Sequence, residues 1–444
     1  MAFHKHILII GGGPAGVQAA LAAAGPGRSV TLVSDGPPGG RAAWQTMLPS
    51  KFWLDTASAN GAPLTAASLK TMHGRFEQVA AAWQQQIQEE LELAGVDLRL
   101  GRASFLSPHE IQIVPPEGGY PDQVSADAII IATGAVPFLP PGLQPDGERI
   151  FSPHTIWKMA ELPRDMIVIG AGGPATEYVD AFSRLGVQIS WITGPVGVLS
   201  AYPPDAGRFI SGVMERRGVK IRSGLLASQI QRTLNGVRLE TAIGSTFDAS
   251  AAFVAIGLRP DLDRLNLPAA GLKPGTSGGM ASDAFGRTAV PHIYLAGDAR
   301  SPLSANISLA QGRLAGLHAA GLETPPMPLD QAVMAIYTRP QVAMVGRMSD
   351  RNQALQKMRT PFRACLRAHL MQREADEEDG FIELTYDAQR RITGALAVCP
   401  EAAEILTALA VAIRAGMTLD DLATICPAHP TFTELAILAA RAAQ

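Results

Sequence analysis

Two short glycine-rich segments have the composition and spacing of a phosphate-binding turn. Residues 11–16 read Gly-Gly-Gly-Pro-Ala-Gly, and residues 170–175 read Gly-Ala-Gly-Gly-Pro-Ala. Glycine lets the backbone approach a pyrophosphate closely, and the unpaired N–H groups at the start of a following helix favour its negative charge. Each segment therefore predicts a dinucleotide-binding turn, although Ala175 replaces the last glycine in the second segment.

The residues around each turn predict the strands and the helix that would position it. Apolar runs at residues 7–10 and 166–169 precede the two turns, a helical stretch follows each turn, and further strand-like runs occupy residues 29–33 and 187–192. A continuous apolar run of this length is typical of a buried parallel strand. The chain is therefore predicted to have an α/β fold with two βαβ nucleotide-binding units.

The acidic residue that commonly binds the ribose of a dinucleotide, near the end of the second strand, is missing from both units. The first unit offers Ser34 followed by Asp35, and the second offers Thr193. A carboxylate holds both ribose hydroxyls and repels a 2′-phosphate, whereas a threonine hydroxyl makes one hydrogen bond. No arginine follows Thr193 before Arg208. The choice between NADH and NADPH is therefore open.

Length and composition narrow the class of protein. The 444 residues predict roughly three domains. The formal net charge is -3 and only 17% of residues are charged, so neither nucleic acid nor an anionic membrane is an expected partner. The first residues lack the basic and apolar regions of a secretory signal, so a cytoplasmic location is expected. The uncharged stretch 405–413 is too short to span a membrane and is predicted to be a core helix.

The three cysteines are Cys365, Cys399 and Cys426, so residues 1–364 contain none. This excludes a disulfide scaffold and a cysteine-rich metal site in that part of the chain. Cys365 and Cys399 are predicted to be small buried hydrophobic residues. The acidic run 374–379 lacks the alternating ligand spacing of a calcium loop, so it is predicted to be a solvated turn, and no metal site is expected.

Two more apolar strands end in small residues, which predicts that the backbone there passes close to a ligand. Residues 129–131 run into Ala132-Thr133-Gly134, and residues 293–295 run into Ala296-Gly297-Asp298. With the two glycine-rich turns, these segments make nearly the whole chain similar to the pyridine-nucleotide disulfide reductase family of dihydrolipoamide dehydrogenase, glutathione reductase and mercuric reductase. The resemblance implies that the first turn binds FAD, that the second binds NADH or NADPH, and that Asp298 bonds the ribityl chain of the flavin.

The resemblance also implies the order of the domains. Proline- and glycine-rich stretches at 137–147 and 322–328 are consistent with boundaries there, and the segment 255–260 resembles the strand that ends the nicotinamide domain. Residues 380–384 and 394–398 are predicted to pair as antiparallel strands. The expected fold has two Rossmann-like dinucleotide-binding domains and an α+β C-terminal dimerisation domain. The predicted domains are FAD-binding residues 1–147 and 263–325, NAD(P)-binding residues 148–262, and dimerisation residues 326–444.

The loop that carries the working cysteines in this family is altered. The family pattern is Gly-Gly-Thr-Cys, four residues, then Cys-Ile-Pro-Ser-Lys, and residues 39–51 match both ends of it. Ala42 and Met47 stand at the two cysteine positions, and neither side chain forms a thiolate or a disulfide. The relay from flavin through a protein disulfide to the substrate therefore cannot operate. Either Met47 and Trp44 only fill the vacated volume, or Met47 places a polarizable thioether near the flavin edge.

Four side chains with proton-transfer or charge-stabilising chemistry match family positions outside that loop. Lys51 and Glu177 correspond to the pair beside flavin N5, where the cation stabilises the reduced flavin and the carboxylate balances the cation. Residues 426–434 resemble the His-Pro-Thr-x-x-Glu signature, in which the histidine, here His429, serves the other subunit's substrate and Glu434 orients it. An imidazole with a solution pKa near ~6.5 exchanges protons at neutral pH. Either His429 protonates a different acceptor, or the loop is a structural part of the dimer interface.

These matches define the predicted site. The expected catalytic residues are Lys51, Glu177, His429 and Glu434. The expected cofactor-binding residues are Gly11, Gly13, Pro14, Ala15, Gly16, Ser34, Asp35, Gly40, Arg41, Ala42, Lys51, Ala132, Thr133, Gly134, Gly170, Gly172, Pro174, Ala175, Glu177, Thr193, Gly257, Gly297 and Asp298. No redox role is expected for Cys426.

The leading functional hypothesis is an FAD-dependent NAD(P)H oxidoreductase that forms a symmetric homodimer. The resemblance implies hydride transfer to flavin N5 across the re face. The electrons must then pass without a protein disulfide to a quinone or another small acceptor. One alternative is a direct reaction of the flavin with a thiol, lipoyl or persulfide substrate. A second alternative is a non-catalytic protein that keeps FAD for folding and serves in binding or assembly.

Overall fold

A computed structural model describes residues 4–59, 64–275, 278–301, 304–371 and 380–443 of the chain, so the acidic run 374–379 lies outside the described residues. The described helices are α1 (Pro14–Ala23), α2 (Gly40–Trp44), α3 (Met47–Ala59), α4 (Ala66–Leu93), α5 (Gly173–Arg184), α6 (Pro204–Arg216), α7 (Ala305–Ala319), α8 (Leu366–His369), α9 (Ala402–Arg414), α10 (Leu419–Ala423) and α11 (Glu434–Ala442). None of these helices is both long enough and apolar enough to cross a membrane.

Two five-stranded parallel sheets dominate the first two thirds of the chain. The first sheet has the order β18 (Ile293–Leu295), β7 (Ala128–Ile131), β1 (Lys5–Ile10), β2 (Arg28–Ser34), β3 (Asp97–Leu100). The second has the order β12 (Lys220–Ser223), β11 (Gln188–Gly194), β10 (Asp165–Ile169), β16 (Ala251–Val254), β9 (Ile150–Phe151). The predicted units β1–α1–β2 and β10–α5–β11 are therefore confirmed, each with parallel strands.

The continuous apolar run in β1 follows from burial on both faces of the first sheet. Ile7 and Ile9 pack in one core cluster with α1, whereas Leu8 and Ile10 pack in a second cluster on the opposite face. Because successive strand side chains point to opposite faces, a strand that is covered on both sides has no polar alternation. The same burial places the carboxyl end of β1 inside the molecule, where the first glycine-rich turn begins.

The predicted strand at residues 255–260 is wrong. The strand of the second sheet is β16 and ends at Val254, whereas β17 (Leu258–Pro260) leaves that sheet and pairs antiparallel with β8 (Ala135–Pro137). Gly257 has a φ of +142°, outside the β region, so the backbone turns away from the sheet at this residue. The paired strands β8 and β17 make the two crossings between the parallel sheets.

A third five-stranded sheet forms the C-terminal part of the chain. Its order is β19 (Met334–Ile336), β20 (Gln341–Gly346), β23 (Ile392–Cys399), β22 (Phe381–Tyr386), β21 (Gln356–Pro361). The predicted antiparallel pairing of residues 380–384 with 394–398 is confirmed, because β22 and β23 pair with Ile382 opposite Ala397. The predicted core helix is also confirmed as part of α9, and Cys365 and Cys399 are both buried.

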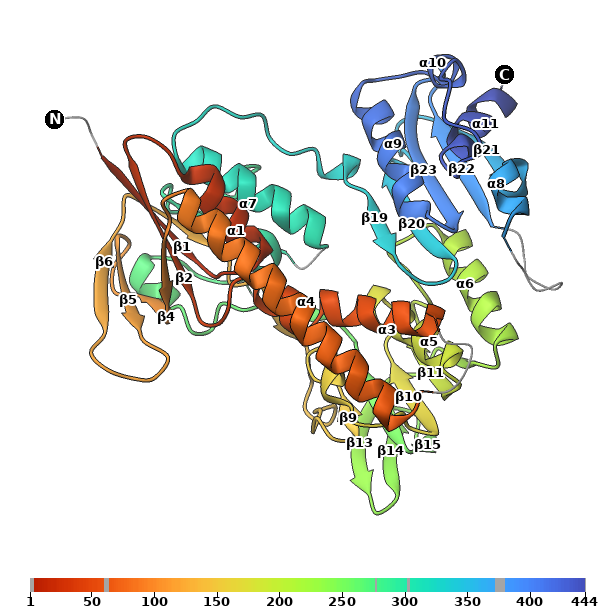
Figure 1. The fold of residues 1–444 in the computed structure, drawn as a ribbon, viewed down its shortest axis with the longest axis horizontal. Helices are drawn as coiled ribbons and strands as arrows, with labels where there is room; N and C mark the ends of the chain where they lie inside the picture. Colours follow the sequence, from red (N-terminus) through yellow and green to blue (C-terminus); the bar gives the residue numbers. More distant parts are fainter. Residues whose placement is uncertain (1–3, 60–63, 276–277, 302–303, 372–379, 444) are drawn as a thin grey trace.

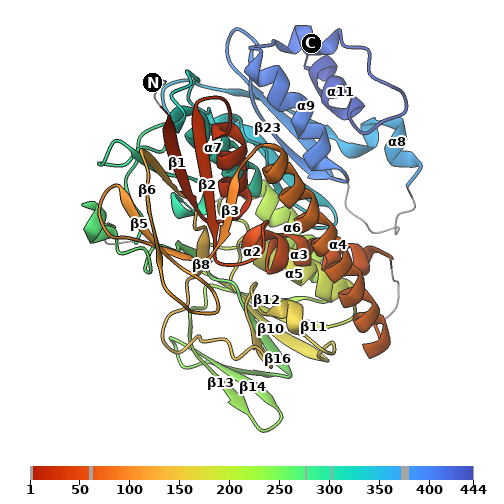
Figure 2. The same ribbon diagram turned by 60° about the vertical axis from the view of Figure 1, so that its left-hand side comes forward.

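The remaining strands form two small antiparallel sheets, β4 (Arg102–Phe105), β5 (Glu110–Val114), β6 (Asp122–Ser125) and β13 (Ala227–Thr233), β14 (Gly236–Thr241), β15 (Thr246–Ala249). Figure 1 shows the first parallel sheet and the C-terminal sheet on opposite sides, the second parallel sheet below them, and the long helix α4 running between. Both Figure 1 and Figure 2 show α3 beside α5, although α3 follows the first glycine-rich turn and α5 follows the second. This packing brings the two βαβ units together.

Candidate functional site

In the first glycine-rich turn, Gly11 and Gly16 have no room for a side chain, whereas the space beside Gly13 is open. Gly11 has a φ of +115°, and a Cβ there would lie 2.3 Å from the carbonyl oxygen of Ala132. A Cβ at Gly16 would lie 1.7 Å from the carbonyl oxygen of Gly11. At Gly13, which caps α1 without a side-chain hydrogen bond, the same space has no neighbour within 4 Å among the described residues. The turn therefore leaves room for an anionic group at the helix N-terminus.

The second turn repeats this geometry. A Cβ at Gly170 would lie 2.1 Å from the carbonyl oxygen of Ala255, whereas the corresponding space at Gly172 is open among the described residues. Ala175, in the place of the third glycine, is fully buried in the packing of α5. Thr193, at the end of β11, is 3% exposed and donates its hydroxyl to Ser223 Oγ at 3.5 Å.

A cavity of about 1950 Å³ extends from the first turn to the start of α5. The predicted site residues that line it are Gly11, Gly13, Pro14, Ala15, Ser34, Asp35, Gly40, Arg41, Ala42, Lys51, Ala132, Thr133, Gly134, Pro174, Glu177 and Asp298. The predicted residues outside its lining are Gly16, Gly170, Gly172, Ala175, Thr193, Gly257, Gly297, His429 and Glu434. Most residues of the predicted FAD site therefore line one cavity together with Lys51 and Glu177. His429 and Glu434 do not line this cavity.

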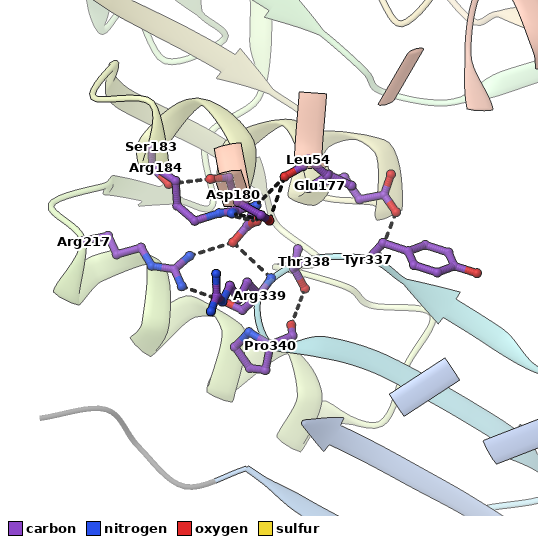
Figure 3. A network of polar contacts seen from close by, with 11 residues as sticks. Leu54, Glu177, Asp180, Ser183, Arg184, Arg217, Tyr337, Thr338, Arg339 and Pro340 are labelled. Carbon is purple, nitrogen blue, oxygen red and sulfur yellow. Dashed lines mark hydrogen bonds and ion pairs between the residues drawn. The ribbon is translucent and has the colours of Figure 1, made fainter. Parts of the chain in front are cut away.

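Lys51 and Glu177 meet at the wall of this cavity. Lys51 Nζ lies 2.8 Å from Glu177 Oε1 and 2.9 Å from Oε2, and the two side chains are 31% and 9% exposed. Glu177 Oε1 also accepts the backbone N–H of Tyr337 at 2.9 Å, as Figure 3 shows, and Lys51 Nζ lies 4.3 Å from the centre of the Tyr337 ring. The pair therefore holds a charge-balanced ammonium group at the cavity surface, with an aromatic face on one side.

The altered loop contributes an apolar wall to the same cavity. Ala42, Trp44 and Met47 all line it, and the Trp44 ring meets Phe76 edge-on at 6.3 Å between centroids. The indole N–H of Trp44 is buried and has no hydrogen-bond partner among the described residues. Both interpretations of Met47 and Trp44 fit this arrangement, because the side chains fill space and also face the cavity.

An ion pair at Arg41 was not predicted from the sequence. Arg41 Nη1 donates to Asp261 Oδ2 at 2.7 Å, and Nη2 donates to the Thr133 carbonyl at 2.5 Å. Burial and the Arg41 cation, opposed by Asp261, lower the pKa of nearby His154 to about 4, so this imidazole is neutral at pH 7. No spacing in the sequence signals this group, because its members come from α2, from the end of β7, from a loop after β9 and from the residue after β17.

Polar residues also lie at or just after the ends of the strands β2, β7 and β18 at the cavity, and some of their polar atoms have partners within the chain whereas others have none among the described residues. Ser34 is 2% exposed and donates its hydroxyl to the Gly36 carbonyl at 2.7 Å, whereas the next residue, Asp35, is exposed at the cavity wall. Asp298 lines the cavity and accepts the hydroxyl of Ser308 at 3.2 Å. The Thr133 hydroxyl is buried without a partner among the described residues, which is unusual for a polar atom unless a ligand satisfies it.

His429 and Glu434 form a second polar pair near the end of the chain. His429 Nδ1 donates to Glu434 Oε2 at 2.8 Å, and Glu434 Oε1 accepts the N–H of Thr431 at 2.5 Å. Burial disfavours the ionised carboxyl, but the hydrogen bonds from His429 and Thr431 outweigh it and hold the pKa of Glu434 below its ordinary value. The imidazole is 63% exposed.

Comparisons with known proteins place these features in context. Residues 5–320 match the model of the pyridine nucleotide-disulphide oxidoreductases, and residues 333–440 match the dimerisation domain of the same class. The chain is 30% identical to an NAD(P)H dehydrogenase (quinone) of Mycobacterium tuberculosis, over 98% of this chain and 93% of that one. It is 29% identical to dihydrolipoyl dehydrogenase 2 of Haloarcula marismortui, over 99% and 96% of the two chains.

Solved structures show the same similarity. The crystal structure of LpdA from Mycobacterium tuberculosis superposes with a TM-score of 0.91 and 29% identity, covering 99% of this chain and 100% of that one. The similarity therefore covers all three five-stranded sheets and the connections between them.

Proposed function

The chain belongs to the pyridine nucleotide-disulphide oxidoreductase family and is an FAD-dependent NAD(P)H oxidoreductase, and we propose that it reduces a quinone or another small acceptor directly. Residues 1–364 contain no cysteine, so the reaction uses no redox disulfide beside the flavin. The observation that carries the proposal is that Lys51 and Glu177 share one cavity with Ala42 and Met47.

The residues of the first turn fit FAD. The open space at Gly13 and the uncapped N-terminus of α1 suit a pyrophosphate, and the buried Thr133 hydroxyl is a donor or acceptor that a ligand can satisfy. Asp35 and Asp298 are two carboxylates of the cavity lining that would accept hydrogen bonds from hydroxyl groups of the cofactor. When bound, FAD supplies the two-electron carrier between nucleotide and acceptor.

The chain's own residues prepare the site for hydride transfer. Lys51 keeps a positive charge at the cavity wall, and Glu177 holds the ammonium group in place through both carboxylate oxygens. A fixed cation stabilises negative charge that develops beside it, and it needs no reorganisation during the reaction. Gly172 and the N-terminus of α5 bind the pyrophosphate of NADH or NADPH by the same physical means as the first turn.

A quinone suits the acceptor side because the altered loop presents apolar atoms. Met47 lines the cavity at one of the two positions where the family has a thiol, and Trp44, which lies between those two positions in the loop, lines it too. A planar, weakly polar acceptor packs well against an indole ring and a thioether. The name of the Mycobacterium tuberculosis relative, NAD(P)H dehydrogenase (quinone), supports the same class of acceptor.

The second candidate is a substrate that brings its own sulfur atoms, such as a dithiol or persulfide. The specific observation in its favour is the intact His429–Glu434 pair: the imidazole can take a proton from a dithiol that reduces the flavin, or give one to the thiolate released when a persulfide is reduced. In either case we propose a homodimer in which the exposed His429 completes the other subunit's site. The domain boundaries and the location in the cell stay predictions.

One anaerobic experiment tests the proposal. The purified yellow protein is mixed with NADH or NADPH, and the bleaching of the flavin absorbance is followed. Fast bleaching is expected with at least one nucleotide, and rapid return of the absorbance is expected on adding a soluble benzoquinone. No bleaching at millimolar nucleotide would overturn the proposal. Reoxidation by lipoamide but by no quinone would select the second candidate.

A further inference from the structure

The buried carboxylate of Asp180, on the same helix as Glu177, accepts hydrogen bonds from Arg184, Arg217 and Arg339. Asp180 lies one helical turn after Glu177 on α5, and its side chain is fully buried. Oδ2 accepts hydrogen bonds from Nε and Nη2 of Arg184 at 3.0 and 2.8 Å. Oδ1 accepts from Nη1 of Arg217 at 2.6 Å and from the backbone N–H of Arg339 at 3.2 Å (Figure 3). All of these donors converge on one carboxylate.

The first connection runs to α3, the helix that carries Lys51. The Arg184 guanidinium, held by Asp180, donates from Nη1 to the Ser58 hydroxyl at 2.9 Å and from Nη2 to the Leu54 carbonyl at 3.3 Å. Leu54 and Ser58 lie one and two turns after Lys51 on this helix. Asp180 therefore orients the guanidinium group that links α5 to α3.

The second connection runs to the segment between β19 and β20. Asp180 accepts the N–H of Arg339, and Arg217 Nη2 donates to the carbonyl of the same residue at 2.6 Å, so the peptide groups on both sides of Arg339 are held. Tyr337, two residues earlier, donates its N–H to Glu177 and places its ring 4.3 Å from Lys51 Nζ. Contacts that restrain Arg339 therefore also restrain Tyr337, whose ring lies beside Lys51 and whose N–H donates to Glu177.

We propose that Asp180 is the positioning residue for the Lys51–Glu177 pair, and that hydride transfer depends on it although it does not line the cavity. The inference rests on the proposed function. Without its negative charge, Arg184 and Arg217 would repel each other inside the protein, and both connections would loosen. Misplacement of a reacting pair by about 1 Å costs up to roughly 10²-fold in rate, even when the cause lies outside the site.

The test is the limiting rate of flavin bleaching by NADH or NADPH in Asp180→Asn, which keeps the side-chain shape and removes the charge. The rate is expected to fall about 10- to 100-fold, with FAD content and the half-saturating nucleotide concentration nearly unchanged. Asp248→Asn is the matched control, because Asp248 pairs with Arg238 on the surface, 61% exposed, and touches neither connection. Its rate is expected to equal that of the unmodified protein.

A double-mutant cycle separates positioning from general loss of structure. If Asp180 acts through the pair, Asp180→Asn has less than about a threefold effect in a Glu177→Gln background, because the pair is already broken there. An equal effect in both backgrounds, or no change in limiting rate, would overturn the proposal. If Asp180→Asn does not fold, Arg217→Gln replaces it, since this side chain is 23% exposed and donates to both Asp180 and the Arg339 carbonyl. Because the Arg184 connection to α3 is kept, a smaller reduction in rate is expected, and this reduction should again shrink in the Glu177→Gln background.

The two proposals fail in different ways. If the unmodified protein is not bleached by either nucleotide, the proposed function fails and this inference falls with it. If the unmodified protein is bleached and Asp180→Asn is bleached equally fast, only the inference fails.

Discussion

Nζ of Lys51 lies 2.8 Å from Oε1 and 2.9 Å from Oε2 of Glu177, although 126 positions separate the two residues in the chain. The carboxylate is 9% exposed and the lysine is 31% exposed, so the pair is partly withdrawn from water. A charge in such a place needs its partner, because an unpaired buried charge is costly. The pair therefore gives the cavity a fixed ammonium group, which the first prediction tests.

Replacing Lys51 by methionine should slow the bleaching of the flavin by nucleotide by about 10²-fold, because the fixed cation is lost while an unbranched side chain one atom shorter is kept. The measurement is anaerobic rapid mixing with excess NADH or NADPH. The matched control is Lys70→Met, since Lys70 is an exposed lysine on α4. Equal bleaching rates in the Lys51→Met and Lys70→Met variants would show that Lys51 does not assist hydride transfer.

In an anaerobic titration, full reduction of the protein should need one molecule of NADH or NADPH for each FAD. Without a disulfide at positions 42 and 47, FAD is the group that accepts the two electrons. The double variant Ala42→Cys with Met47→Cys should need two nucleotides once its disulfide forms. An end point of two nucleotides in the unmodified protein would reveal a second redox group and contradict the proposed electron path.

His429→Gln should lower steady-state turnover with a quinone by about 10²- to 10⁴-fold, the usual contribution of an acid/base group, and should leave flavin reduction by nucleotide unchanged. The imidazole is 63% exposed in one chain and pairs with Glu434, and in the proposed homodimer it serves the second subunit's acceptor. His369→Gln is the control, because His369 is another exposed histidine of the same domain. A loss with lipoamide as acceptor, and none with quinone, would assign the histidine to the sulfur substrate.

Thr193→Glu should shift cofactor preference toward NADH. The Thr193 hydroxyl donates to Ser223 and carries no charge, so it neither repels a 2′-phosphate nor holds both ribose hydroxyls. A carboxylate at this position should lower kcat/KM for NADPH by at least about tenfold relative to NADH. Thr233→Glu, at an exposed position on β13, should leave the ratio of the two kcat/KM values unchanged.

Acid should destabilise the cofactor-free protein partly through His154. Its pKa is ordinarily 6.5 and is lowered to about 4 in the folded chain by burial and by the Arg41 cation. Between these two pH values the unfolded chain binds a proton that the folded chain does not, so folding stability falls as the pH falls, by up to about 1.4 kcal/mol per pH unit. His154→Gln lacks this titration. Chemical unfolding of both proteins at pH 7 and pH 5 should show that the free energy of unfolding falls less in the variant. An equal fall in both proteins would contradict the lowered pKa of His154.

The sequence alone predicts the parts of this protein that depend on residues close together in the chain. Residues 7–33 and 166–192 contain complete βαβ units, because hydrophobic periodicity and glycine spacing act over a few tens of residues. The replacement of two family cysteines by Ala42 and Met47 is also visible without a structure, since a residue type by itself decides whether a thiolate can form. The error at residues 255–260 arose locally, where Gly257 adopts a positive φ and the strand ends early.

The tertiary structure alone decides which distant residues meet. Arg41 pairs with Asp261 across 220 positions, and Arg339 meets Asp180 across 159. These contacts depend on how the two parallel sheets and the C-terminal sheet pack, and no periodicity in the sequence encodes them. Buried polar groups need partners, but any correctly placed donor satisfies a carboxylate. The identity of the partner therefore follows from the packing, which is why the proposed positioning role of Asp180 can be inferred only from the folded chain.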